Sequence, residues 1–184
     1  MQLYSCCFAF NAKRTHVLLL RKAKPEWQAG LLNGIGGKTS FAVDATIMDT
    51  TIREFKEETG LMGLGDFNPL IYHAMCWPEY KTHTGWPLVY FSAGILSDQL
   101  MLDAVANTVR SPEPCTIQPL AKIVPSNMMS NLPFLIEMAL CLAVCSPEDR
   151  KLRQPIVLSP TSYTLLVDHI QDGDGKRLVM DWPE

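Results

Sequence analysis

Three glutamates lie close together in the segment Arg53–Gly60, at spacings that a helix brings onto one face. They are Glu54, Glu57 and Glu58. Arg53 can pair with Glu57 one turn along, whereas Lys56 points almost opposite Glu54. The face therefore keeps two or three carboxylates without a counter-charge, which suits a hard divalent cation such as magnesium. The alternative is an ordinary solvated acidic helix face.

Glycines flank this acidic segment on both sides. The run Leu31–Gly37 contains three glycines, and Gly60 follows the last glutamates. A run of this kind suits the end of a strand where the backbone must approach another group closely. Gly60 stands where a left-handed cap would end a helix.

Together these residues resemble a known signature. Gly36-Gly37-Lys38, an expected helix and Arg-Glu-Phe-Lys-Glu-Glu-Thr-Gly-Leu at 53–61 are similar to the box of the Nudix hydrolase family, G-x5-E-x7-R-E-U-x-E-E-x-G-U, where U is a bulky aliphatic residue. The second half matches, with Phe55 at an aliphatic position. The first half departs, because Ala45 stands where the family has glutamate and the spacing from Gly37 to Arg53 is two residues longer. Asp44 is the nearest acid that could stand in.

The resemblance implies hydrolysis of a diphosphate linkage of the nucleoside di- or triphosphate type, by attack of water on phosphorus. The implied cofactor is Mg²⁺, with Mn²⁺ as a substitute. The implied metal ligands are the Gly37 carbonyl and the carboxylates of Glu54, Glu57 and Glu58. Arg53 would orient a glutamate, and Glu57 or Glu58 would accept the proton of the water.

Many family members add an acid from a distant loop. The candidates here are Glu79 and Glu113, and Glu113 is preferred because it precedes a possible strand. An ordinary loop glutamate is the alternative for either position.

The substrate is inferred from the segment Leu32–Lys38, which is similar to that of nucleoside triphosphate hydrolases that clear oxidised purines. The similarity implies a base contact for Asn33, and Lys38 is a further candidate for substrate binding. Other candidate contacts are Asn131, for the base edge, and Trp27 or Phe134, for stacking. Simpler roles are a turn for Asn33, a helix cap for Asn131 and plain packing for the aromatic residues.

Other readings of the function stay open. Within the family, the alternative substrates are ADP-ribose, nucleotide sugars, dinucleoside polyphosphates and capped RNA. Outside catalysis, the missing glutamate at Ala45 favours a Nudix-like module that senses a nucleotide without cleaving it. The intact glutamates favour the enzyme.

The hydrophobic pattern predicts the elements that carry these residues. A hairpin is expected from Leu3–Phe10 and His16–Leu20, and a helix from Asp44 or Thr46 to Thr59, with Met48, Ile52 and Phe55 toward the core. The other expected elements are strands at Leu70–Trp77, Pro87–Leu96 and Cys115–Ile123 and a helix at Asn131–Cys145. This order predicts an α+β fold, and the resemblance implies a Nudix-type α/β/α sandwich with a mixed central sheet.

The chain is expected to divide at residue 150. Residues 1–150 would form the Nudix hydrolase domain, and residues 151–184 a C-terminal extension packed on the same domain. Asp-Gly-Asp-Gly at 172–175 predicts a hairpin turn between Tyr163–Ile170 and Arg177–Trp182. This hairpin could serve as a dimerisation element or a substrate lid, so a homodimer is possible.

Composition narrows the partners and the location. The formal net charge of -3 and the pI near 5.8 argue against broad nucleic-acid binding. The six cysteines lack zinc-ligand spacing and indicate a reduced protein. No signal peptide is expected at the N-terminus, and Met138–Cys145 is too short to cross a bilayer. We therefore expect a cytoplasmic protein without a membrane partner that binds a small nucleotide.

Overall fold

The computed structural model describes residues 2–76, 87–123, 127–129, 131–143, 166–167 and 180–181 of the 184 in the chain. Within these ranges, no helix combines the length and the apolar character that a bilayer span requires. The expected loop at Pro78–Trp86, with Glu79, lies outside the described residues.

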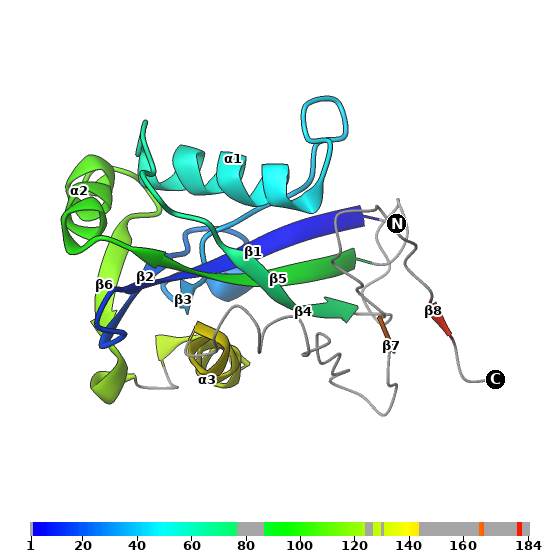
Figure 1. Cartoon of the computed structure of the whole chain (residues 1–184). Coiled ribbons are helices and arrows are strands. Elements are labelled where there is room, and N and C mark those ends of the chain that lie inside the picture. The colour runs from blue at the N-terminus through cyan, green and yellow to red at the C-terminus, as the bar shows by residue number, and fades with distance from the viewer. Residues whose placement is uncertain are drawn as a thin grey trace.

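A mixed sheet forms the centre of the molecule (Figure 1). Its strands are β1 (Gln2–Asn11), β2 (His16–Arg21), β3 (Leu32–Asn33), β4 (Leu70–Cys76), β5 (Pro87–Leu96) and β6 (Cys115–Pro119). The order is β3-β2-β1-β5-β4, and β6 pairs with β2. Only the β1–β5 pair is parallel among these strands. The predicted hairpin is confirmed as the antiparallel pair β1–β2.

Helices cover both faces of this sheet. Figure 1 shows α1 (Ile47–Thr59) and α2 (Asp98–Thr108) on one face and α3 (Leu132–Ala143) on the other. Successive side chains of β1 alternate between the two cores, as the pleat of a strand requires. Phe8 and Phe10 enter the core beneath α3, while Cys7 and Ala9 enter the core beneath α1. The predicted α+β sandwich with a mixed sheet is confirmed.

Helix α1 begins and ends with strong local signals. The Thr46 side chain accepts a hydrogen bond from the Asp49 N–H, and the Asp49 side chain accepts one from the Thr46 N–H, so the two form a capping box. At the other end, Gly60 has a φ of 66° and closes the helix in the left-handed conformation. The helix therefore occupies the predicted range with little freedom at either end.

The buried face of α1 agrees with the prediction in part. Phe55 is fully buried and the half-buried Ile52 packs against the same core, whereas Met48 is only half-buried and Thr51 and Thr59 are buried as well. Each of these threonines donates a hydrogen bond to the carbonyl four residues earlier, at 2.9 Å for Thr51 and 2.5 Å for Thr59. This contact satisfies the hydroxyl inside the helix, so threonine can lie in the core at little cost.

Other elements were predicted in part or not at all. Helix α3 agrees with the prediction, whereas α2 was missed, although Ser97 caps it by accepting a hydrogen bond from the Leu100 N–H. Strands β7 (Leu166–Val167) and β8 (Met180–Asp181) pair antiparallel, in agreement with a hairpin there. The predicted turn at 172–175 lies outside the described residues, and the domain division stays a prediction. Two short 3₁₀ helices, η1 (Glu26–Gln28) and η2 (Leu120–Lys122), complete the described elements.

Candidate active site

The glycine run lies against β1 and against the acidic helix. Ser5 donates its N–H to the Gly37 carbonyl at 2.9 Å, and Cys7 exchanges two backbone hydrogen bonds with Ile35. A Cβ atom on Gly36 would overlap the Ser5 backbone, and one on Gly37 would overlap the carboxylate of Glu54. The predicted close approach at this strand end is therefore confirmed, and it seats Glu54 directly over Gly37.

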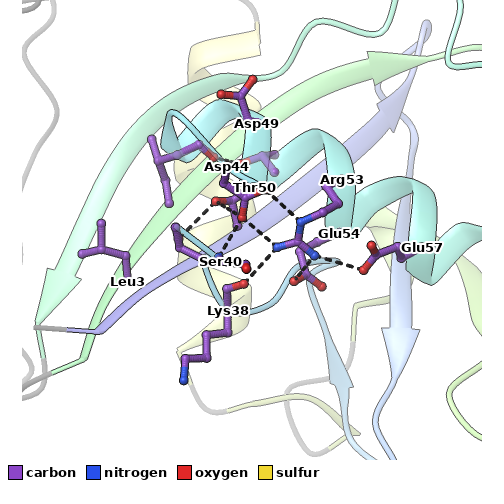
Figure 2. A network of polar contacts seen from close by, with 12 residues as sticks. Leu3, Lys38, Ser40, Asp44, Asp49, Thr50, Arg53, Glu54 and Glu57 are labelled. Carbon is purple, nitrogen blue, oxygen red and sulfur yellow. Dashed lines mark hydrogen bonds and ion pairs between the residues drawn. The ribbon is translucent and has the colours of Figure 1, made fainter. Parts of the chain in front are cut away.

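Arg53 orients two of the three glutamates (Figure 2). Its Nη1 donates to Glu54 Oε1 at 2.8 Å and to Glu57 Oε2 at 3.0 Å, and its Nη2 donates to the Lys38 carbonyl at 3.0 Å. The predicted pairing of Arg53 with Glu57 is thus present. Burial raises the pKa of Glu54 although Arg53 opposes that rise.

Asp44 is the acid that holds Arg53 in place. Nε and Nη2 of Arg53 donate to the two oxygens of Asp44 at 2.9 and 2.8 Å. Asp44 is buried and also accepts hydrogen bonds from the Ser40 N–H at 2.8 Å and the Thr50 hydroxyl at 3.0 Å. The hydrogen bonds from Arg53 hold the pKa of Asp44 well below its usual range. Asp44, rather than a residue at position 45, thus supplies the carboxylate that contacts this arginine.

Glu58 faces a second cation. Its Oε2 accepts the Gly36 N–H at 2.7 Å, and its Oε1 lies 3.6 Å from Nζ of Lys22. Burial raises the pKa of Glu58 to about 7, although Lys22 and the Gly36 N–H both act to lower it. Glu58 therefore titrates near neutral pH, which is the range required of a general base.

Glu113 reaches the same cation from the other side. Its Oε2 lies 2.5 Å from Nζ of Lys22, and its Oε1 accepts the N–H groups of Ala23 and Lys24 at 2.7 and 3.0 Å. Burial alone would raise the pKa of Glu113, but these hydrogen bonds lower it. The structure thus brings Glu113 to the predicted glutamates through Lys22.

Four of these carboxylates line an open cleft of about 470 Å³. Its lining includes Lys24, Glu54, Glu57, Glu58, Asn107 and Glu113. Within the described residues, the ion-pair partners of five carboxylates, those of Asp44, Glu54, Glu57, Glu58 and Glu113, are Arg53 and Lys22 alone. The cluster therefore carries a surplus of negative charge.

The donor set is suited to a hard divalent cation. It offers carboxylate oxygens together with the Gly37 carbonyl, and magnesium prefers oxygen ligands. Across the described part of the chain, no three His, Cys, Asp or Glu side chains already converge as a metal cage. The carboxylates are instead turned toward Arg53 and Lys22.

Solved structures share this architecture. NrtR of Shewanella oneidensis is 19% identical, with a TM-score of 0.57 over 76% of this chain and 62% of that chain. A mutT/nudix family protein of Listeria innocua is 16% identical, with a TM-score of 0.55 over 76% of this chain and 92% of that chain. The chain has the Nudix fold.

A further structure shows a ligand on a Nudix fold. The NUDIX domain of S. oneidensis NrtR was solved with ADP ribose; it is 17% identical, with a TM-score of 0.51 over 75% of this chain and 84% of that chain. S. oneidensis NrtR was also solved in complex with a 27mer DNA. This chain spans about three fifths of the NrtR chain. No protein-family model matches the sequence, and no curated protein matches it.

The predicted substrate contacts lie outside the carboxylate cleft of this Nudix fold. None of the residues lining that cleft is among Trp27, Asn33, Lys38, Asn131 or Phe134. The side chains of Trp27, Phe134 and Lys38 are exposed. Asn33 is half-buried and accepts the Gly34 N–H at 2.8 Å, as the turn alternative expects.

Asn33 and the start of α3 are nevertheless neighbours. Leu32 bridges to Met128, and the Met129 N–H donates to the Leu32 carbonyl at 3.2 Å. The chain then reaches Asn131, whose carbonyl accepts the Leu135 N–H in the first turn of α3. Residues distant in sequence are thus brought beside one another, although their roles in binding stay predictions.

Two lysines at the site, Lys22 and Lys24, were not predicted from the sequence. Lys22 comes two residues after the predicted strand His16–Leu20, where it looks like an ordinary surface lysine. The pairing of β2 with β6 reveals its neighbours. Lys24 lines the cleft without an ion pair to a described carboxylate.

Proposed function

We propose that this chain hydrolyses the diphosphate linkage of a small nucleotide with the help of a bound divalent cation, magnesium or manganese. The observation that carries this proposal is the cleft lined by four carboxylates, those of Glu54, Glu57, Glu58 and Glu113, whose ion pairs in the described part of the chain are with Arg53 and Lys22. A solvated acidic face would leave its carboxylates exposed, whereas the side chains of Glu54 and Glu58 are only 15% and 18% exposed. Keeping such a surplus out of water is costly unless a cation binds.

The proposed ligands are the carboxylates of Glu54, Glu57 and Glu58 and the carbonyl of Gly37, with Glu113 as a further carboxylate. The position of the Glu54 carboxylate directly against Gly37 supports this set of ligands. A side chain at position 37 would displace that carboxylate. When bound, a divalent cation would lower the pKa of a water molecule and neutralise charge on the phosphates.

The chain's own residues supply the remaining chemistry. Glu58 would accept the proton of the attacking water, because its carboxylate lines the cleft beside the proposed metal ligands. Glu57 is the alternative base, and its 59% exposed side chain is open to the cleft. Arg53 would keep Glu54 and Glu57 in one orientation through its fixed fork of donors.

The substrate is proposed as a nucleoside di- or triphosphate of the purine type. Asn33 and Asn131 would contact the base, Trp27 or Phe134 would stack on it, and Lys38 would meet the phosphates. ADP-ribose, which was bound to the NUDIX domain of NrtR, is the first alternative because it contains the same diphosphate linkage.

A panel of nucleotides incubated with Mg²⁺ or Mn²⁺, with identification of the products, tests this function. We expect turnover of at least one nucleotide and a fall of about a hundredfold or more in kcat for Glu57→Gln, because a ligand or base is removed. Glu137→Gln, an exposed glutamate on α3, is the matched control and should retain activity. Absence of turnover for every nucleotide and both metals would contradict the proposal.

A second candidate is a nucleotide-binding module without hydrolysis. Ala45, which replaces the glutamate of the family signature, favours it, and so do the ADP ribose and DNA complexes of NrtR. Binding of a nucleotide without product release in the same panel would support this candidate over the enzyme.

A further inference from the structure

Lys22 is placed by the register of two strands. β2 pairs antiparallel with β6, with Leu20 opposite Cys115, and the Arg21 N–H donates to the Pro114 carbonyl at 3.0 Å. The next residues in this register, one beyond Arg21 and Pro114, are Lys22 and Glu113, which therefore lie opposite each other. The backbone therefore fixes the contact between Nζ of Lys22 and Oε2 of Glu113 at 2.5 Å.

The same ammonium group faces the acidic helix. Nζ of Lys22 lies 3.6 Å from Oε1 of Glu58, which comes from the last turn of α1. The three side chains are only 15%, 18% and 21% exposed, so water screens them weakly. One positive charge thus joins two carboxylates from elements far apart in the sequence.

Lys22 contacts the carboxylate oxygens that are not already hydrogen-bonded to the backbone, and these are the oxygens that a divalent cation could use. Oε2 of Glu58 is occupied by the Gly36 N–H, and Oε1 of Glu113 by the N–H groups of Ala23 and Lys24. The free oxygens, Oε1 of Glu58 and Oε2 of Glu113, both face Lys22. A divalent cation that uses them must meet the lysine, and two cations on the same oxygens repel each other.

We propose that Lys22 is a built-in competitor for the divalent cation: its ammonium group pairs with Glu58 and Glu113 in the metal-free protein and withdraws when the cation binds. This inference rests on the proposed function. Lys22 therefore sets the metal affinity of the site. Its departure frees Oε2 of Glu113 as a ligand, while Oε1 stays anchored to the backbone.

Lys24 provides a matched control. It lines the same cleft, but it forms no ion pair with any carboxylate that the structure describes. Removing its charge alters the general field of the cleft without releasing the oxygens of Glu58 and Glu113. The two lysines thus separate direct competition from a general electrostatic effect.

Calorimetric titration of Mn²⁺ into the full chain without nucleotide, in the same buffer for every variant, tests the proposal. We expect Lys22→Met to bind Mn²⁺ about tenfold more tightly than wild type. Lys22→Arg, which keeps the charge, should bind within about threefold of wild type, and Lys24→Met within about twofold. Thermal unfolding in chelator checks that each variant is folded, and Lys22→Gln replaces Lys22→Met if the apolar side chain prevents folding.

Each outcome decides between the two proposals. Tighter binding by Lys22→Met alone supports the competitor, including the case in which wild type is too weak to detect. Equal or weaker binding by Lys22→Met, or an equal gain in Lys24→Met, overturns the competitor while the metal site of the proposed function stands. If neither wild type nor Lys22→Met binds Mn²⁺, both proposals fall.

Discussion

At the scale of single residues, the lack of a side chain at Gly37 makes room for the carboxylate of Glu54. The Glu54 carboxylate occupies the space that a Cβ of residue 37 would fill. Arg53 then fixes the carboxylate from the other side with a 2.8 Å hydrogen bond. Glu54 is therefore held in one position before any ligand arrives, which lowers the entropy that binding must overcome.

Gly37→Ala is expected to weaken Mn²⁺ binding by about tenfold or more, because the new methyl group displaces the Glu54 carboxylate. Gly63→Ala is the matched control, since a Cβ there meets no atom within 4 Å. The affinity of that variant should equal that of wild type. Calorimetric titration of both proteins with Mn²⁺ under the same conditions measures the two affinities. An unchanged affinity in Gly37→Ala would show that Glu54 does not bind the metal.

At the scale of elements, α1 and the loop before it act as one unit. The resemblance to the Nudix signature located the helix, its glutamates and its glycine cap, all of which depend on local sequence. The signature did not locate the partner of Arg53, because the loop is two residues longer and carries Ala45. Asp44 meets the arginine only through the fold of the loop, where the Ser40 N–H and the Thr50 hydroxyl hold it.

The same local reasoning was incomplete for the buried face of α1. The hydrophobic pattern placed Phe55 and Ile52 toward the core, as observed, but it did not indicate the buried threonines, whose hydroxyls bond to their own helix. Helix α2 was missed for a related reason. Its buried residues are Met101, Ala104 and Thr108, and this stripe is short and only weakly apolar.

Asp44→Asn should reduce the free energy of unfolding by about 2 kcal/mol, because the buried partner of Arg53 loses its charge and one of its acceptors. Activity should fall as well, since Arg53 would no longer hold Glu54 and Glu57 in place. Urea denaturation measures the first effect. Asp66→Asn changes an exposed aspartate and should stay within about 0.5 kcal/mol of wild type. If Asp44→Asn and Asp66→Asn had the same free energy of unfolding, the contact between Asp44 and Arg53 would not stabilise the fold, which would contradict the positioning role of Asp44.

At the scale of the whole molecule, the site depends on contacts that no local pattern encodes. The β2–β6 register brings Lys22 to Glu113, and the approach of the glycine run to β1 brings the Gly36 N–H to Glu58. Fold class and the α1 carboxylates could be predicted because periodicity and a motif specify them. Long-range strand pairing could not be predicted, because it follows from the packing of the entire sheet.

The overall charge also acts at this scale, and it leads to a prediction about partners. Nineteen acidic and sixteen basic side chains give a formal net charge of -3, which predicts no general attraction for the phosphate backbone of a nucleic acid. We expect no binding to a random duplex DNA at about 150 mM salt and at protein concentrations up to about 10 μM, measured by fluorescence anisotropy. A basic DNA-binding protein on the same duplex serves as the positive control. Salt-sensitive binding by this chain would show instead that its cations are concentrated on one surface, because only a local excess of positive charge could then outweigh the acidic cleft.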